Sequence, residues 1–389
     1  MKRDNGFGVG GRPLGRDLAC TVWARTVLIQ AVLPRKPHAL TQRVPDRARA
    51  DHFRHVLQPY WGADLRRSVI QLLTSALPFF ALWYVMLWSL EVGYWLTLLL
   101  ALPTAAFLMR LFMIQHDCGH GSFFRSRAAR DAVGSCIGVL TLVPYQYWRK
   151  THAYHHAHAG NLDFRGFGDI DTLTVREYLA LSRRSRLAYR LYRHPLVLFL
   201  IGPAFHFLIK HRFPWDIPRE WREAWRSVWR TNLALVAITV AMALTIGLQR
   251  FLLVQLPLTL VTCSIGVWLF YVQHQFEETY WHRRETWDFF DAALEGSSHL
   301  VLPRPLQWLT ANIGLHHVHH LSSRIPNYRL QEVIDAHPEL HRVTRITLKD
   351  GLRLATLSLW DEDAVRLIRF RDVRGREHGE ARGPIAAAA

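Results

Sequence analysis

Histidines are grouped in three short segments of this chain, and imidazole is a strong ligand for first-row transition metals. The segments read HDCGH at 116–120, HAYHH at 152–156 and HHVHH at 316–320. Within a segment the histidines are mostly three or four residues apart, so on a helix we expect their rings to project from one face, about one turn apart. The eight candidate ligands are His116, His120, His152, His155, His156, His316, His319 and His320.

The number of these histidines indicates two metal ions side by side. One ion takes about four to six ligands, and eight imidazoles exceed that number. His274, in YVQHQFEETYW directly after an apolar stretch, is a candidate ninth ligand because eight would leave one ion short. Glu277 and Glu278 follow within about one turn and are candidate acceptors for its other ring nitrogen. The alternative is that His274 is an interfacial histidine at a helix end.

The neighbouring residues narrow the choice among iron, zinc, copper and nickel. A zinc protease would need HExxH, whereas Asp117 follows His116 here. Soluble di-iron bundles use Glu together with ExxH motifs, which the clusters lack. Two iron ions in a nearly all-histidine shell, with open positions for O₂, are the better interpretation. We expect Cys118, His158 and His317 to lie outside the ligand set.

Five polar residues near the clusters have two possible roles each. Asp117, Asp163, Asp169 and Asp171 either orient imidazoles by accepting an Nδ1–H hydrogen bond or cap helices after glycine-rich turns. Asn312 either binds iron through a water molecule or caps the helix that carries the last cluster.

Apolar segments of membrane-spanning length position the clusters. The segments 68–90, 92–114, 231–248 and 251–272 approach or exceed the about 20 residues that cross a bilayer, and two short turns join them as pairs. Shorter apolar runs at 132–145 and 196–209 predict interfacial or re-entrant helices. Arginines flank the outer ends of the first pair, which places those ends in the cytoplasm. Two hairpins then bring every cluster to one membrane face, as a shared site requires.

The sequence therefore predicts an all-α integral membrane protein with four transmembrane helices in two hairpins, interfacial helices and a cytoplasmic histidine-rich helical cap. We divide the 389 residues into a basic flexible N-terminal tail (1–50), a membrane domain (51–350), and a C-terminal helix with a disordered tail (351–389). The expected location is a bacterial inner membrane, with the active site on the cytoplasmic side.

The formal charge of +17 does not by itself indicate nucleic-acid binding. The chain has no stacking-aromatic module, zinc-finger spacing or basic-region heptad. In a membrane protein, a basic excess usually marks cytoplasmic loops, and it could attract anionic lipid or an acidic partner. The four cysteines are scattered without a CxxC pair, which is compatible with a reducing cytosolic face.

The order HxxxH, HxxHH and HxxHH, with apolar hairpins between, resembles that of the membrane-bound fatty acid desaturases. The connecting segments are similar to those of the acyl-lipid branch that includes omega-6 (Δ12) enzymes. These segments read WRKTHAYHHAHAGNLDFRGFGDIDTLTVREY, QHQFEETYW and LPRPLQWLTANIGLHHVHHL. The resemblance spans roughly residues 60–350 and its motifs are highly specific.

The resemblance implies a non-haem di-iron enzyme that uses O₂ and two electrons to remove two hydrogens from a fatty acyl chain, which we expect to be lipid-linked. It carries metal ligation onto the eight clustered histidines and extends it to His274. No GxGxxG opens a strand-to-helix unit in this chain, and there is no haem motif of the CxxCH or HPGG kind. A separate electron donor of the ferredoxin or cytochrome b5 type is therefore implied.

Two other functions remain open on the sequence. A fatty acyl hydroxylase or epoxygenase, or a carotenoid ketolase, could use the same scaffold, because the same oxidant can also place oxygen on carbon. A membrane metal transporter is the more distant alternative. Transporters bind their ions near the membrane midplane and often contain inverted repeats, whereas these clusters lie beyond the ends of the apolar stretches.

Overall fold

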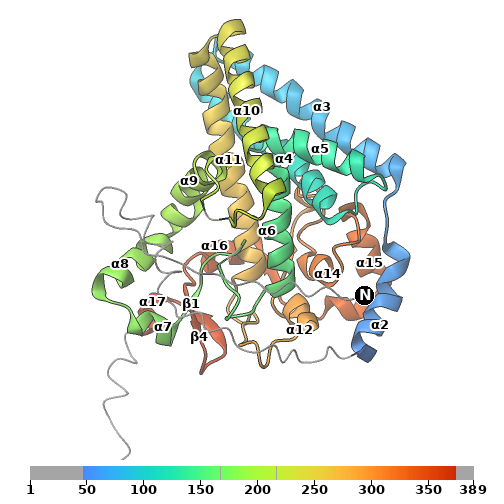
Figure 1. Ribbon diagram of the computed structural model, residues 1–389, viewed down its shortest axis with the longest axis vertical. Coiled ribbons are helices and arrows are strands. Elements are labelled where there is room, and N and C mark those ends of the chain that lie inside the picture. Colours follow the sequence, from blue (N-terminus) through green and yellow to red (C-terminus); the bar gives the residue numbers. More distant parts are fainter. Residues whose placement is uncertain (1–46, 167, 216, 374–389) are drawn as a thin grey trace, which may run out of the picture.

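The structure is a computed structural model that describes residues 47–166, 168–215 and 217–373 (Figure 1). Four long helices form its upper half: α3 (Leu65–Ser89), α4 (Tyr94–His120), α10 (Arg222–Thr245) and α11 (Leu248–His274). Each is long and apolar enough to cross a membrane. They confirm the prediction of four apolar helices of membrane-spanning length. The predicted tails, except for residues at their inner ends, lie outside the described residues.

Short turns connect the long helices in sequence, α3 to α4 and α10 to α11. Arg250, in the first turn of α11, contacts Glu91 of the α3–α4 turn through a 2.5 Å ion pair. The arginine therefore pairs with an acid at the same end of the four helices. The outer helices expose large apolar side chains: Leu77 of α3 is 66% exposed, and Leu244 of α10 is 83% exposed. Exposure of this extent suits a hydrocarbon surrounding.

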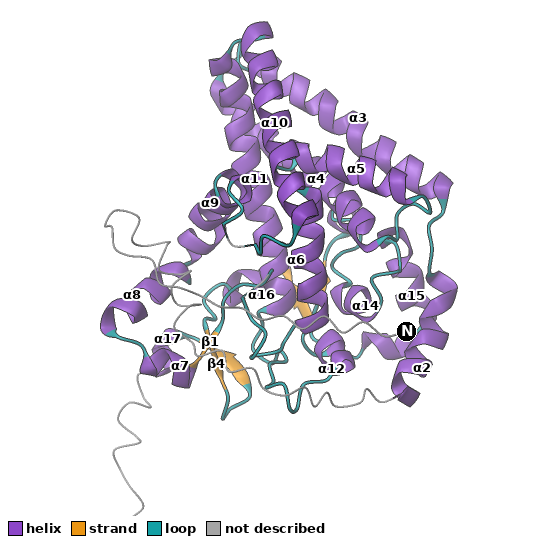
Figure 2. Cartoon of the chain, viewed as in Figure 1, coloured by secondary structure: helices purple, strands orange, loops and turns teal. Residues whose placement is uncertain are grey.

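The lower half of the molecule is made of shorter helices packed below α4 and α11 (Figure 2). The elements that position the histidines are α6 (Tyr145–His158) and α14 (His316–Leu321), with α5 (Arg127–Leu140) beside α4. The remaining helices are α2 (Arg47–Leu57), α7 (Val175–Ala180), α8 (Arg183–Tyr192), α9 (Gly202–Leu208), α12 (Phe289–Leu294), α13 (Arg304–Leu309), α15 (Leu330–Ala336), α16 (Leu348–Leu354) and α17 (Phe370–Val373).

Short strands modify the expectation of an all-α protein. The strands β1 (Leu173–Thr174), β4 (Leu359–Asp361) and β5 (Arg366–Ile368) form one sheet, with β1 and β4 parallel and β4 and β5 antiparallel. The strands β2 (His299–Val301) and β3 (Arg345–Thr347) pair in parallel. The predicted C-terminal helix beyond residue 350 is therefore interrupted by β4 and β5. Strands of two or three residues are too short to give a recognisable alternation of apolar and polar residues.

The apolar run at 196–209 forms a bent segment. It continues from α8 through one turn of π-helix, η2 (Val197–Ile201), into α9 and η3 (Lys210–Arg212). The part before the break lies at 61° to the part after it. Pro195 lies at the bend and lacks the N–H that a continuous helix would use. By length and composition this pair is either a broken span or a re-entrant segment.

Candidate metal centre

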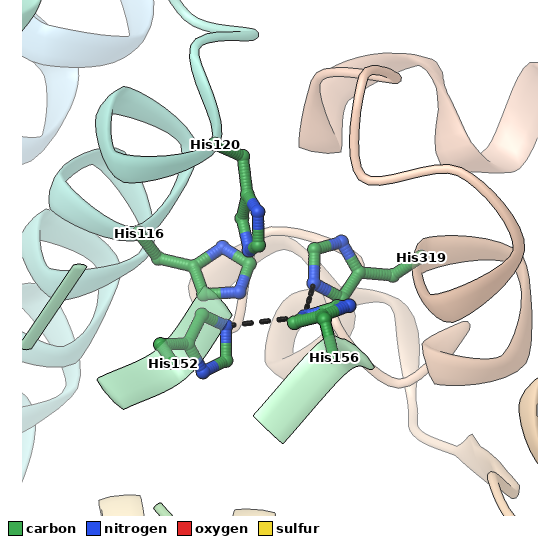
Figure 3. Close-up of side chains that lie close together, drawn as sticks. All are labelled: His116, His120, His152, His156 and His319. Carbon is green, nitrogen blue, oxygen red and sulfur yellow. Dashed lines mark hydrogen bonds between the residues drawn. The ribbon is translucent and has the colours of Figure 1, made fainter. Parts of the chain in front are cut away.

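All nine histidines singled out in the sequence lie together at the C-terminal ends of α4 and α11, in two adjacent groups. The five-histidine group contains His116, His120, His152, His156 and His319 (Figure 3). The four-histidine group contains His155, His274, His316 and His320. Within each group the candidate ligand nitrogens all lie within 4.8 Å of one another, so each group has the size of a metal site.

The groups divide the sequence clusters rather than following them. Histidines four residues apart stay together, as His152 and His156 do in the five-histidine group. Their neighbour His155 belongs to the other group, because successive helix positions differ by about 100°. The last cluster is divided in the same way, with His319 in one group and His316 in the other. The prediction of a single face was therefore wrong for these two clusters, whose helices α6 and α14 each serve both groups, whereas the first cluster stays together on α4.

Hydrogen bonds to Nδ1 fix the protonation of two rings in the four-histidine group. Nδ1 of His155 contacts the carboxylate of Asp169, and Nδ1 of His274 lies 3.0 Å from the carbonyl oxygen of Gly296. Both nitrogens therefore carry the proton and donate it, which leaves Nε2 of each neutral ring unprotonated. These two Nε2 atoms face each other at 3.2 Å. Two facing lone pairs repel unless a cation lies between them, so the donor set fits a metal ion.

The five-histidine group has a comparable arrangement. His116 Nδ1 lies 3.0 Å from Oδ1 of Asp117, and the other carboxylate oxygen accepts hydrogen bonds of 2.7 and 2.8 Å from the backbone and side chain of Asn327. The Nε2 atoms of His156 and His319 are 3.1 Å apart. Nε2 of His120 is buried without a hydrogen-bonding partner among the described residues. A metal ion would satisfy these nitrogens.

Burial keeps five of the clustered imidazoles neutral. It lowers the pKa of the five ring systems outside the long helices well below the usual imidazole range, and the neighbouring rings lower it further. These rings belong to His152, His156, His316, His319 and His320. A neutral imidazole is the form that binds metals, so the surroundings favour ligation.

The polar residues suggested by the sequence are only partly used. Asp117 and Asp169 accept from imidazoles, whereas Asp163 accepts from Arg283 at 2.9 Å. Asn312 donates to the backbone of Asn327 at 3.0 Å.

The acceptor for His274 was also predicted incorrectly. Glu277 and Glu278 are exposed, and the carbonyl of Gly296 contacts the ring instead. The role of Asn327 was missed as well, because no local motif marks a residue 210 positions away from the carboxylate that it contacts.

The residues expected outside the ligand set do lie outside both groups. His317 is fully buried, with its ring 6.0 Å from that of His299. His158 contacts the carbonyl of Tyr154 at 3.0 Å. Cys118 is buried and belongs to neither group.

A cavity of about 990 Å³ reaches the histidines from the membrane half of the molecule. His116, His152 and His316 form part of its wall, and most of the remaining wall is apolar, including Met109 and Phe270. Trp148 also lines it and stacks on His152 at a ring distance of 4.4 Å. A cavity of this volume is at the upper end of the usual range for small-molecule sites, about 300–1,000 Å³. The site can therefore hold a large apolar molecule against the histidines.

Comparisons with known proteins agree with this arrangement. The family model described as fatty acid desaturase matches residues 93–344. A fatty acid desaturase of Bacillus subtilis (strain 168) is 50% identical over 311 residues, 80% of this chain and 88% of the relative. An sn-1 oleoyl-lipid 12-desaturase of Anabaena variabilis is 27% identical, covering 63% of this chain and 69% of that protein. An sn-1 acyl-lipid omega-3 desaturase (ferredoxin) of Synechocystis is 27% identical, covering 58% and 63%.

Proposed function

The chain belongs to the fatty acid desaturase family, and from that premise we propose that it forms a double bond in a lipid-linked acyl chain at a di-iron centre held by the nine histidines. The observation that carries the proposal is the pair of adjacent imidazole groups opening onto an apolar cavity. A mononuclear site would not use nine converging rings.

The reaction balances with O₂ as the oxidant. The acyl chain loses two hydrogens, O₂ accepts them together with two electrons and two protons, and two water molecules form. When bound, the iron ions would supply the oxidising power for an unactivated C–H bond. The protein contributes position: Phe270 and Met109 shape an apolar wall that holds the chain extended and excludes water.

The chain's own residues also hold the ligands in place. Asp169 and the carbonyl of Gly296 keep the protons of His155 and His274 on Nδ1, so that Nε2 faces the centre. Asp117 does the same for His116. Such supporting contacts fix the tautomer and raise the basicity of the ligating nitrogen.

The electrons come from a separate protein in this proposal. With the two helix pairs in the membrane, the histidines and the arginine-rich segments face the cytoplasm, where a ferredoxin or a cytochrome b5 with its reductase could dock. The Synechocystis relative is named as a desaturase that uses ferredoxin. Acidic donors and a basic surface attract each other over long range, so we predict that raising the ionic strength slows reduction by the donor. Salt-insensitive turnover with a physiological donor would contradict this docking.

The central experiment expresses the wild-type chain in a host lacking polyunsaturated lipids and maps new double bonds by mass spectrometry. His155→Ala and His319→Ala remove one ligand from each group, and the exposed His52→Ala is the matched control. We expect both ligand variants to lose unsaturation and iron, with the control unchanged. Full activity in both would overturn the di-iron assignment. A product heavier by one oxygen, in place of one lighter by two hydrogens, would instead identify a hydroxylase, epoxygenase or ketolase.

A further inference from the structure

The cavity that reaches the histidines also has a polar wall that the proposed chemistry does not use. His206 of α9 and Lys210 and His211 of η3 line the cavity, away from the nine clustered histidines in sequence. The rings of His206 and His211 lie 4.4 Å apart. An acyl chain has no polar atom along its length, so these three side chains suit the part of the substrate to which the chain is attached.

The three side chains offer both charge and hydrogen bonds. Nδ1 of His211 lies 3.3 Å from the carbonyl oxygen of Leu142 and donates to it, so its Nε2 is an acceptor. His206 has no hydrogen-bonding partner among the described residues, and its ring can donate to a ligand. Lys210 supplies an ammonium group beside both rings. A head group with an anionic oxygen and an alcohol or amine matches the charge and the hydrogen-bonding groups of this wall.

The cavity wall beside Lys210 meets an apolar surface. Ile209, Phe213 and Trp215 are 43%, 53% and 48% exposed, respectively, and Trp215 also lines the cavity. Leu196 and Leu200, on the preceding turns, are exposed as well. Exposed aromatic and aliphatic side chains beside a cation are typical of the membrane–water interface. Because Trp215 is both exposed and part of the cavity wall, this side of the cavity suits a substrate that enters from the bilayer.

From these observations we propose that His206, Lys210 and His211 form a subsite for the phosphate-bearing head of a glycerophospholipid whose acyl chain lies in the cavity. This inference rests on the proposed function and names the carrier of its substrate. The phosphate faces Lys210, because charge-assisted hydrogen bonds to phosphate are the strongest that the wall can make. The acyl chain then passes His116 and His152 toward Met109 and Gly266, which line the cavity within α4 and α11.

An acidic residue of the same cavity wall is consistent with such a ligand. Asp171 lines the same cavity and interacts electrostatically with Lys210. A bare anion would meet repulsion from this carboxylate. The alcohol or amine of a phospholipid head can donate to Asp171 while the phosphate binds Lys210. The opposite charges of Lys210 and Asp171 therefore fit a phospholipid head group better than a free fatty acid.

The test measures lipid binding and therefore does not depend on turnover. Native mass spectrometry of the full-length protein in detergent compares dipalmitoyl phosphatidylglycerol with dipalmitoyl glycerol, which has the same chains and no phosphate. We expect Lys210→Gln to weaken phosphatidylglycerol binding about tenfold, the effect of losing one charge-assisted hydrogen bond, and to affect dipalmitoyl glycerol much less. Lys210→Arg should restore most of the difference. Lys349→Gln, an exposed lysine on α16, is the matched control.

Three outcomes would overturn the subsite. In the first, Lys210→Gln weakens the binding of both lipids equally. In the second, it weakens the binding of neither lipid. In the third, the wild-type protein binds palmitoyl acyl carrier protein more tightly than phosphatidylglycerol. The proposed function fails differently: the wild-type chain would then create no double bonds in cells, even with the phospholipid bound and Lys210 essential for that binding.

Discussion

The two histidine groups use the same side chain, but different parts of the fold support them. In the five-histidine group, α4 and α6 contribute a pair each at four-residue spacing, and His319 of α14 completes the set. The four-histidine group takes a pair from α14 and single residues from α6 and α11. Four of the five rings in the first group thus come from two helices that pack directly together. Both groups draw on three helices, but in the second group only the two rings from α14 share a helix.

The supporting contacts differ in the same way. Asp117 lies on α4 beside the histidine that it orients, and Asn327 anchors its second oxygen. In the four-histidine group, Asp169 comes from the loop after α6 and Gly296 from the segment between α12 and β2. The comparison teaches that the five-histidine group is the more preorganised of the two. Metal binding should therefore be more easily lost from the four-histidine group.

Removal of one ligand from each group should give the largest effect. His120→Ala leaves four imidazoles in its group, whereas His274→Ala leaves three. We expect His274→Ala to lose the metal of its group and His120→Ala to retain part of its own. Both should lower desaturation by more than about 100-fold, because ligand loss exceeds the about 10–100-fold effect of losing a supporting contact. Metal analysis of purified protein and lipid analysis of cells measure the two effects. Greater metal loss in His120→Ala would reverse the comparison.

Neutralising one supporting carboxylate in each group should give a smaller effect. Asp169→Asn and Asp117→Asn keep the shape of the side chain and remove its charge. We expect each to weaken metal binding in its own group by about 10–100-fold. The loss should be greater for Asp169→Asn, because Asp169 comes from a loop whereas Asp117 lies on α4 next to the histidine that it contacts. Iron titration of the two proteins gives the affinities. Equal affinities would show that the two histidine groups do not differ in preorganisation.

Acidification should give the smallest difference in metal binding between the two groups. Burial lowers the pKa of His152, His156, His316, His319 and His320, so the folded protein keeps these rings neutral. Below about pH 6.5, the ordinary imidazole pKa, the unfolded chain binds more protons than the folded chain, and stability falls as the pH falls. Protons also compete with the metal.

We therefore expect metal to dissociate between about pH 6.5 and about pH 5, first from the four-histidine group. Equilibrium dialysis at graded pH, with thermal melting of the metal-free protein alongside, measures both effects. A metal-free protein whose stability is constant across this range would show that the rings are not held neutral.

Much of this site was predictable because its signals are local. The spacing of the histidines identified eight of the nine members of the two groups, and the position of His274 after an apolar stretch identified the ninth. The four apolar stretches became α3, α4, α10 and α11. The actual helices extend beyond the apolar stretches: α4 continues to His120 and α11 to His274. The apolar composition of a helix stops at the membrane boundary, whereas its backbone hydrogen bonds continue beyond that boundary.

The parts that could not be predicted depend on contacts between distant residues. The split between His155 and His156 requires knowing that α6 lies between two groups of partners, which the local spacing does not reveal. The carbonyl of Gly296 has no side chain to suggest its role, and Asn327 contacts Asp117 from across the fold. The strands β4 and β5 were missed because each is only three residues long.

The position of α14 in the chain has a consequence for biosynthesis. Neither group is complete without α14, because His319 belongs to one group and His316 and His320 to the other. This helix lies after all four long apolar helices, so it leaves the ribosome last among the elements that carry the nine histidines. Until then the nascent chain holds partial sets with open positions. Metal loading therefore follows insertion of the helices into the membrane, and a chain truncated before residue 316 cannot form either complete group.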